Sequence, residues 1–186
     1  MKDKTLLVFA HADEAEAFTD VPHLVTGIGK INAAVHLTEA ILAAAKDIDR
    51  VIVMGTAGAI HDEAQFDTVY QIAQVLQHDF SLPSPTLELS GELVAPHSAV
   101  IATGDVFVQS DELRRALAEL GASLVDMETY AYAVTCERLK VPLQVFKTPS
   151  DFADSSTTQD EWNGIVGTKS QQLRLFTEQH LPNLLG

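Results

Sequence analysis

Two short acidic segments hold the side chains of this chain that are best placed to do chemistry. The first is Leu124–Glu128 and the second is Pro149–Asp154, and the strand-like Leu143–Phe146 lies between them. Carboxylates at the ends of apolar segments are typical of α/β enzymes, because strand ends are rigid and open onto the binding crevice. Such groups can donate a proton to a leaving group or stabilise a positive charge in the transition state. We therefore expect Glu128 and Asp151 to share one site.

Apolar runs alternate with helical patterns along the chain, and these elements must position the acidic segments. The apolar runs predict strands at Thr5–Phe9, His23–Thr26, Val51–Met54, Thr68–Leu76, Ala99–Ala102 and Leu143–Phe146. Helical spacing predicts helices over Ile31–Lys46, Asp111–Leu120, Thr129–Leu139 and Asp160 to about Leu181, with Asp111 and Asp160 as N-caps. The alternation predicts a single α/β domain over residues 1–186, a three-layer α/β/α sandwich with a central mixed sheet.

The composition limits the partners that this chain can have. Its 186 residues include 26 Asp and Glu against 12 Lys and Arg, a formal net charge of −14 at pH 7. Such a surface repels phosphate backbones and anionic lipid, so neither nucleic acid nor a membrane is expected as a partner. The single cysteine, Cys136, lies in an apolar helical run and is expected to pack in a core, in a reducing compartment.

The sequence also predicts where the protein is found and whether it binds a metal. The N-terminal apolar run is too short for a signal peptide, and no run approaches the length that crosses a bilayer, which predicts a cytoplasmic protein. The seven histidines do not fall at metal-ligand spacings. We therefore expect no metal and no other cofactor.

Two glycine-containing loops follow predicted strands. Gly27–Lys30 precedes a helix, whose N-terminus favours anions, but its spacing is that of neither a Walker loop nor a full dinucleotide fingerprint. Gly55–Gly58 follows Val51–Met54, and its small residues with the Thr56 hydroxyl would let a sugar or base approach the backbone closely. Tight packing of a strand on a helix would produce the same residues, so the loops alone leave both interpretations open.

Together these segments resemble the nucleoside phosphorylase and nucleosidase superfamily, and within it the methylthioadenosine/S-adenosylhomocysteine nucleosidases. That branch carries a Met-Glu pair and an S-D-x-A-D turn, matched here by Met127-Glu128 and Ser150–Asp154. It also carries G-I-G-K and G-S-A-G, matched by Gly27–Lys30 and, with Thr in place of Ser, by Gly55–Gly58. Further colinear matches extend the resemblance over nearly the whole chain: Asp67–Val69, His78-Asp79, Thr103–Phe107 and Asp160–Trp162.

The resemblance implies a phosphorylase/hydrolase-like fold and cleavage of a purine N-glycosidic bond, through an oxocarbenium-like sugar as in glycoside hydrolysis. Asp151 is expected to protonate purine N7, with Phe146 and Phe152 as apolar surroundings that favour its protonated form. Glu128 is expected to accept hydrogen bonds from the 2′ and 3′ hydroxyls, with Met127 packed on the sugar or base. On the residues alone, a turn-capping Asp and a solvated Glu are the alternatives.

The other substrate contacts implied by the resemblance lie in the glycine and base-pocket loops. Phe107 is expected to stack near the base, and the backbone of Val108 is expected to contact the edge of the base. A phenylalanine that only packs in the core would give the same sequence pattern at position 107. The remaining predicted substrate-binding residues are Thr56, Ala57, Gly58 and Ser150. Asp154 suits a capping role better than a catalytic one and is expected only to support the site.

Attack at C1′ needs a group that positions and deprotonates water. In the nucleosidases the last Glu of A-M-E-E-E-V handles the nucleophile, and Ala10–Glu16 places Glu14 at that position. The segment departs from the family pattern before Glu14, where His11 stands in place of Met. His11 could assist the water or touch the ribose. A surface helix with acidic residues in its first turn would show the same pattern as this segment.

The nucleophile distinguishes two classes of enzyme. Phosphorylases of this superfamily hold phosphate with arginines, whose forks match its oxygens. None of the five arginines of this chain lies in the His11, Gly27 or Gly55 loops, where only Lys30 adds a positive charge. We therefore predict an N-ribosyl hydrolase of the EC 3.2.2 type that acts on an adenosine-type nucleoside. A phosphate-dependent phosphorylase and a non-catalytic nucleoside-binding module remain as alternatives.

The 5′ group of the substrate and the oligomeric state are less determined. Ser155–Gln159 is polar and lacks the apolar residue that meets a methylthio group in the nucleosidases. A futalosine-like compound, another 5′-modified adenosine and an unmodified nucleoside therefore all remain open. The resemblance implies a homodimer in which the partner closes the 5′ pocket, with Leu82–Leu93 as a candidate contact.

Overall fold

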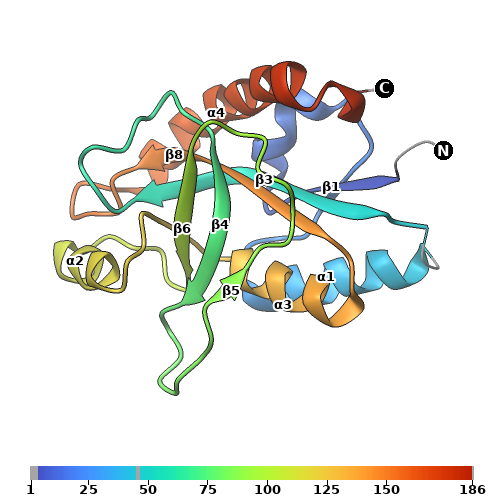
Figure 1. The fold of residues 1–186 in the computed structure, drawn as a ribbon. Coiled ribbons are helices and arrows are strands. Elements are labelled where there is room, and N and C mark those ends of the chain that lie inside the picture. The colour runs from blue at the N-terminus through green and yellow to red at the C-terminus, as the bar shows by residue number, and fades with distance from the viewer. Residues whose placement is uncertain (1–3, 45–46, 186) are drawn as a thin grey trace.

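The computed structural model describes residues 4–44 and 47–185, which form a mixed sheet with helices on both faces (Figure 1). The strand order is β2 (His23–Val25), β1 (Thr5–Phe9), β3 (Arg50–Ala59), β7 (Leu124–Asp126), β6 (Ser98–Thr103), β4 (Tyr70–Gln77) and β5 (Leu87–Glu88). The eighth strand, β8 (Leu143–Asp151), pairs with both β3 and β4. The predicted α/β fold with a central mixed sheet is confirmed.

Strand pairing brings the two acidic segments to opposite sides of the end of β3. Gly58 of β3 lies opposite Asp151 of the parallel strand β8 and opposite Val125 of the antiparallel strand β7. β7 in turn runs parallel to β6, with Asp126 opposite Thr103. Because β4 pairs with both β6 and β8, the pairings close a circuit through β3, β8, β4, β6 and β7. The acidic segments therefore meet at one edge of this circuit.

Two pairs of helical elements cover the faces of the sheet. α1 (Lys30–Ala43) and α3 (Thr129–Leu139) pack on each other on one face, and α4 (Gln159–His180) packs with η1 (Ala12–Phe18) on the other (Figure 1). The remaining helical elements are α2 (Asp111–Glu119) and η2 (Pro182–Leu184). Separate apolar clusters form the cores of the two faces, one including Val53, Ile101 and Val145 and the other including Phe9, Phe146 and Phe176.

Two further observations concern the helices. Cys136 of α3 is buried in the core on this face of the sheet, and burial raises the pKa of its thiol to about 12, which confirms the predicted packing role. No helix within residues 4–44 and 47–185 combines the length and the apolar character needed to cross a membrane.

The structure corrects four of the expected boundaries. β3 does not end before Gly55 but continues through the glycine segment to Ala59, and β8 continues through Pro149 to Asp151. The predicted turns are therefore strand ends. The N-caps of α2 and α4 are Ser110 and Thr158, whose side chains accept the N–H groups of Leu113 and Glu161. Asp111 and Asp160 instead occupy the first turns, where carboxylates also favour a helix.

Candidate functional site

A cavity of about 230 Å³ lies where the ends of β3, β7 and β8 meet η1 and α4. Every residue predicted from the sequence to catalyse or to bind substrate lines it: His11, Glu14, Thr56, Ala57, Gly58, Phe107, Val108, Met127, Glu128, Ser150 and Asp151. The segments that carry these residues are far apart in the chain, so the fold assembles the site.

Glu14 is fixed at the start of η1 by hydrogen bonds to both of its carboxylate oxygens. Its Oε1 accepts the backbone N–H of Thr56 at 2.7 Å and the Thr56 hydroxyl at 2.8 Å. Its Oε2 accepts the backbone N–H of His11, the N-cap residue of η1, at 3.2 Å. Only 4% of Glu14 is exposed. The carboxylate needs the glycine at position 55, because a Cβ there would lie 2.8 Å from Oε1.

Glu128 is held at the opposite wall, immediately before α3. Its Oε1 accepts the backbone N–H of Gly29 at 2.8 Å, and Gly29 is the N-cap of α1. Burial is the largest cause that raises the pKa of Glu128 to about 8, and the negative charge of Asp126 adds to it. The charge of Lys147 and the Gly29 hydrogen bond oppose this rise. The glycine loop before α1 therefore binds a carboxyl group of the protein itself, in keeping with the affinity of helix N-termini for oxygen acceptors.

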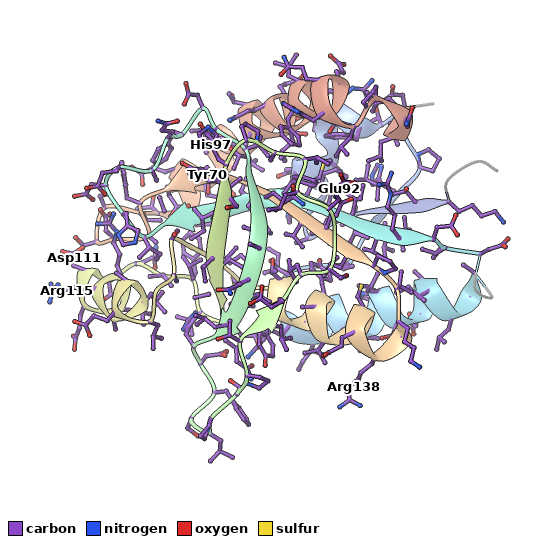
Figure 2. All side chains as sticks on the ribbon, viewed as in Figure 1. Tyr70, Glu92, His97, Asp111, Arg115 and Arg138 are labelled. Atoms are coloured by element: carbon purple, nitrogen blue, oxygen red, sulfur yellow. The ribbon has the colours of Figure 1, made fainter. Side chains whose placement is uncertain are left out.

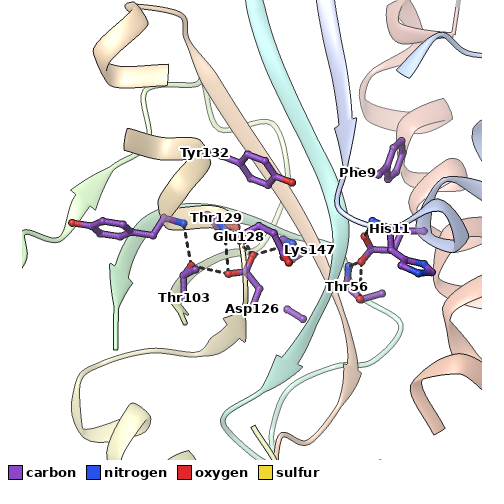
Figure 3. Close-up of polar contacts among 12 residues, drawn as sticks. Phe9, His11, Thr56, Thr103, Asp126, Glu128, Thr129, Tyr132 and Lys147 are labelled. Carbon is purple, nitrogen blue, oxygen red and sulfur yellow. Dashed lines mark hydrogen bonds and ion pairs between the residues drawn. The ribbon is translucent and has the colours of Figure 1, made fainter. Parts of the chain in front are cut away.

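A buried ion pair lies beside Glu128, and Figure 3 shows its hydrogen-bond network. The Nζ of Lys147 lies 3.0 Å from Oδ2 of Asp126, and these side chains are only 1% and 2% exposed. Asp126 also accepts the hydroxyls of Thr103 and Thr129 at 2.7 and 2.5 Å. Burial lowers the pKa of Lys147, but the charges of Asp126, Glu14 and Glu128 outweigh it and raise the pKa overall.

The Asp151 carboxylate accepts hydrogen bonds from its own turn. Its Oδ2 accepts the Ser150 hydroxyl at 2.7 Å, and its Oδ1 accepts the backbone N–H of Ala153 at 2.9 Å. Neither of the rings expected around this group is among the residues that line the cavity: Phe146 packs on Phe176 in the core, and Phe152 packs on Phe66. Hydrogen-bond donors, rather than these rings, hold the carboxylate of Asp151.

Asp154 has the supporting role that the sequence predicted. Its Oδ1 accepts the hydroxyl of Ser156 at 2.6 Å and the Ser156 backbone N–H at 2.9 Å. The hydroxyl bond is the largest cause that lowers the pKa of Asp154. Asp154 does not line the cavity, so its contacts stabilise the turn that follows β8.

Sequence reasoning missed two residues at this site. Lys147 was not singled out, although a lysine inside an apolar strand is a signal of a buried partner. Trp162 of α4 lines the cavity, donates its indole N–H to Oγ1 of Thr56 at 3.0 Å and places its ring edge-on to that of His11, with centroids 5.3 Å apart. Its place in the first turn of the helix after the Asp151 segment could have suggested this contact.

Four carboxylates thus line the cavity, those of Glu14, Asp126, Glu128 and Asp151, and none of the described residues that line it is a lysine or an arginine. Glu14, Glu128 and Asp151 each carry a different set of hydrogen bonds. Such a site can move protons and stabilise a cation. It offers no positively charged side chain to a polyanionic ligand.

The chain is similar in sequence to nucleosidases of two kinds. An aminodeoxyfutalosine nucleosidase of Helicobacter pylori is 31% identical over 152 residues, which are 68% of this chain and 65% of the relative. The chain thus spans just under two thirds of that relative's length. A 5′-methylthioadenosine/S-adenosylhomocysteine nucleosidase of Colwellia psychrerythraea is 27% identical over 191 residues, which are 84% of this chain and 78% of the relative.

Solved structures share the fold over almost the whole chain. A 5′-methylthioadenosine/S-adenosylhomocysteine nucleosidase from Helicobacter pylori superposes with a TM-score of 0.85 at 20% identity, covering 98% of this chain and 99% of its own. Futalosine hydrolase of Helicobacter pylori superposes with a TM-score of 0.83 at 21% identity, covering 100% and 98%. Residues 19–179 match the family described as the phosphorylase superfamily. The chain therefore belongs to the phosphorylase superfamily.

Proposed function

We propose that this protein is a purine nucleosidase, which hydrolyses the N-glycosidic bond of an adenosine-type nucleoside to free base and a ribose derivative. The observation that carries the proposal is the convergence of Glu14, Glu128 and Asp151 on one cavity. The names of the relatives, which are nucleosidases of methylthioadenosine and of aminodeoxyfutalosine, support it.

The proposed reaction begins at the base. As the C1′–N bond lengthens, Asp151 donates a proton to N7 of the purine, so that the base leaves as a neutral molecule. Phe107 and Val108 line the cavity and would hold the base there. Ser150 donates to the Asp151 carboxylate at 2.7 Å and would keep it oriented while its proton is transferred.

The sugar becomes electron-poor as the base departs. Glu128 would accept hydrogen bonds from the 2′ and 3′ hydroxyls, and its negative charge would stabilise the oxocarbenium-like ring. Met127 lines the same wall and would pack on the ribose. Because the backbone N–H of Gly29 takes one lone pair of Oε1 of Glu128, the other carboxylate oxygen has the most lone pairs left for the hydroxyls.

Water would attack C1′ while Glu14 takes its proton. A carboxylate has about four lone-pair positions, and three of them accept protein donors in Glu14, two on Oε1 and one on Oε2. The remaining position lies on Oε2, so this oxygen would act as the base. The proton released from water goes to Glu14 and the proton gained by the base comes from Asp151, so the reaction balances.

Phosphorolysis is less well supported, because the arginines are engaged or directed elsewhere. Arg114 pairs with Asp62 and Arg174 pairs with Asp20. Arg115 and Arg138 are exposed and point away from the body of the protein (Figure 2). None of the described residues that line the cavity could provide the bidentate fork that suits phosphate.

We propose a homodimer, because apolar side chains surround the cavity without cover in this chain. Ile28 and Val106 line the cavity and are each 45% exposed. Ile31 and Val35, on the adjoining helix α1, are 77% and 48% exposed. A second copy packed over these residues would enclose the open side of the site. Within each copy, the helices on both faces of the sheet would make up the three-layer sandwich.

The direct test is to incubate the protein with adenosine, 5′-methylthioadenosine and an aminodeoxyfutalosine-type nucleoside, with and without inorganic phosphate, and to follow free base by chromatography. The proposal predicts base release at a rate that phosphate does not change, with free ribose derivative as the second product. A rate that needs phosphate, with a ribose 1-phosphate product, would indicate a phosphorylase. Binding without release of base would indicate a nucleoside-binding module.

A further inference from the structure

We propose that Trp162 is a positioning residue for the proton-accepting carboxylate, acting on Glu14 through the hydroxyl of Thr56. The indole Nε1 of Trp162 lies 3.0 Å from Oγ1 of Thr56, and this same oxygen lies 2.8 Å from Oε1 of Glu14. The three side chains thus form one hydrogen-bonded chain from α4, through β3, to η1. This inference rests on the proposed function, in which Glu14 accepts the proton of water.

The chemistry of the three groups determines the direction of the hydrogen bonds. An indole N–H only donates, whereas a hydroxyl has one proton to donate and lone pairs to accept with. Since Trp162 occupies a lone pair of the Thr56 oxygen, the single proton of Thr56 is free to point at Glu14. Oε1 of Glu14 then accepts both the hydroxyl and the backbone N–H of Thr56. Trp162 therefore favours the arrangement that leaves Oε2 available to the water.

The position of Trp162 is itself well determined. It lies in the first turn of α4, where Thr158 and Glu161 form a capping box. Its ring meets the His11 ring edge-on, and the backbone N–H of His11 donates to Oε2 of Glu14. Trp162 thus contacts both residues that donate to the Glu14 carboxylate.

α4 also holds the backbone on which Glu14 lies. The hydroxyl of Ser170 donates to the backbone carbonyl of Glu14 at 2.7 Å and accepts the backbone N–H of Ala17 at 2.9 Å. The same helix therefore holds both the main chain and, through Trp162, the side chain of Glu14. A catalytic group needs this kind of support from rigid elements if it is to keep its geometry during the reaction.

The variant Trp162→Phe tests the proposal, because it keeps an aromatic side chain at this position and removes the N–H donor together with one ring of the indole. We expect kcat to fall roughly 3- to 10-fold, as for the loss of one neutral hydrogen bond, and KM to change less than about twofold. The effect falls on kcat because the proton of water moves only in the transition state. A rise in KM alone would overturn the proposal and show that Trp162 is a wall of the substrate pocket.

A double-mutant cycle with Thr56→Val decides whether Trp162 acts through Thr56. Valine has the shape of threonine without the hydroxyl, so Trp162→Phe should cost nothing further in the Thr56→Val background. Thr56→Ser, which keeps the hydroxyl, is the matched background, and in it Trp162→Phe should again lower kcat roughly 3- to 10-fold. Equal losses from Trp162→Phe in both backgrounds would overturn the proposal.

Fluorescence provides a readout that does not depend on activity. Trp162 is the single tryptophan of the chain, so its emission reports directly on this contact. We expect Thr56→Val to shift the emission maximum of the folded protein and Thr56→Ser to leave it unchanged. If the parent released no base, the proposed function would fail, yet an unshifted emission in Thr56→Val would still refute the contact. If the parent released base and Trp162→Phe were as fast, only the positioning role would fail.

Discussion

The backbone N–H of Gly29 donates to Oε1 of Glu128 at 2.8 Å and joins two segments that lie 99 residues apart in the chain. Gly29 has a φ of +94°, a backbone conformation that residues with a Cβ rarely adopt. The backbone N–H of the next residue, Lys30, donates to Asp105 at 2.7 Å, so the loop is anchored on both sides. The glycine loop thus holds the carboxylate that we propose as the ribose ligand.

Gly29→Ala should weaken nucleoside binding. The new Cβ would be strained at positive φ and would lie 3.1 Å from Oδ1 of Asp105, so the loop and its bond to Glu128 would shift. We expect an increase in KM of roughly tenfold and a loss of about 1–3 kcal/mol in the free energy of unfolding. Steady-state kinetics and urea denaturation would measure the two effects.

Gly121→Ala is the matched control for this substitution. Gly121 has a φ of +87°, and a Cβ there would meet nothing within 4 Å. Its stability cost should be of the same order, because the backbone strain is similar. An equal rise in KM in both variants would mean that general destabilisation, rather than the contact with Glu128, weakens binding.

Nucleoside affinity should depend on the ionisation of Glu128. Its pKa in the folded protein is raised to about 8, so at neutral pH the carboxyl is mostly protonated and must lose its proton to accept both ribose hydroxyls. The Kd of a non-hydrolysable nucleoside analogue should therefore fall as pH rises towards 8, by up to about tenfold per pH unit, and then level off. Titration of Trp162 fluorescence would measure the Kd.

Glu128→Gln provides the control for this pH dependence, because an amide of the same shape does not titrate in this range. The variant should bind more weakly, with a Kd that stays flat across the same pH interval. A parent Kd that does not change with pH, or a Gln variant with the same slope, would show that another group is responsible.

The buried Lys147–Asp126 pair should be essential for stability. Lys147→Met would leave Asp126 as an unpaired buried charge, and such changes cost about 3–5 kcal/mol. Lys4→Met is a suitable control, because Lys4 pairs with Asp47 at 2.7 Å on the surface, where the side chains are 53% and 72% exposed. That substitution should lower the free energy of unfolding, measured by urea denaturation, by less than about 1 kcal/mol. Similar losses in both variants would contradict the importance of the buried pair.

Much of the fold and most of the proposed site could be predicted, from local patterns and from the resemblance to the nucleosidases. The helical spacing of apolar residues predicted a helix over Thr129–Leu139, and α3 has the same bounds in the structure. Met127-Glu128 follows β7 and Ser150-Asp151 ends β8, and neighbouring strand ends meet at one edge of a sheet. A short motif after a strand is therefore enough to place its residues near the cavity.

What the sequence did not reveal depends on contacts between distant segments. Gly55–Gly58 looks like a turn, yet β3 runs through it, and Glu14 occupies the space that a side chain at position 55 would fill. The reason for this glycine therefore lies 41 residues before it in the chain. The hydrogen bond between Trp162 and Thr56 likewise joins residues 106 positions apart, and no local pattern predicts it.

Hydrolysis by Asp151→Asn is the most direct measurement, because the central claim is that Asp151 protonates the departing purine. The variant keeps the shape of the side chain but has no acidic proton to donate. We predict a fall in the single-turnover rate of base release of about 10²- to 10⁴-fold, with the Kd for the nucleoside unchanged within about threefold. A variant that released base as fast as the parent would contradict the account.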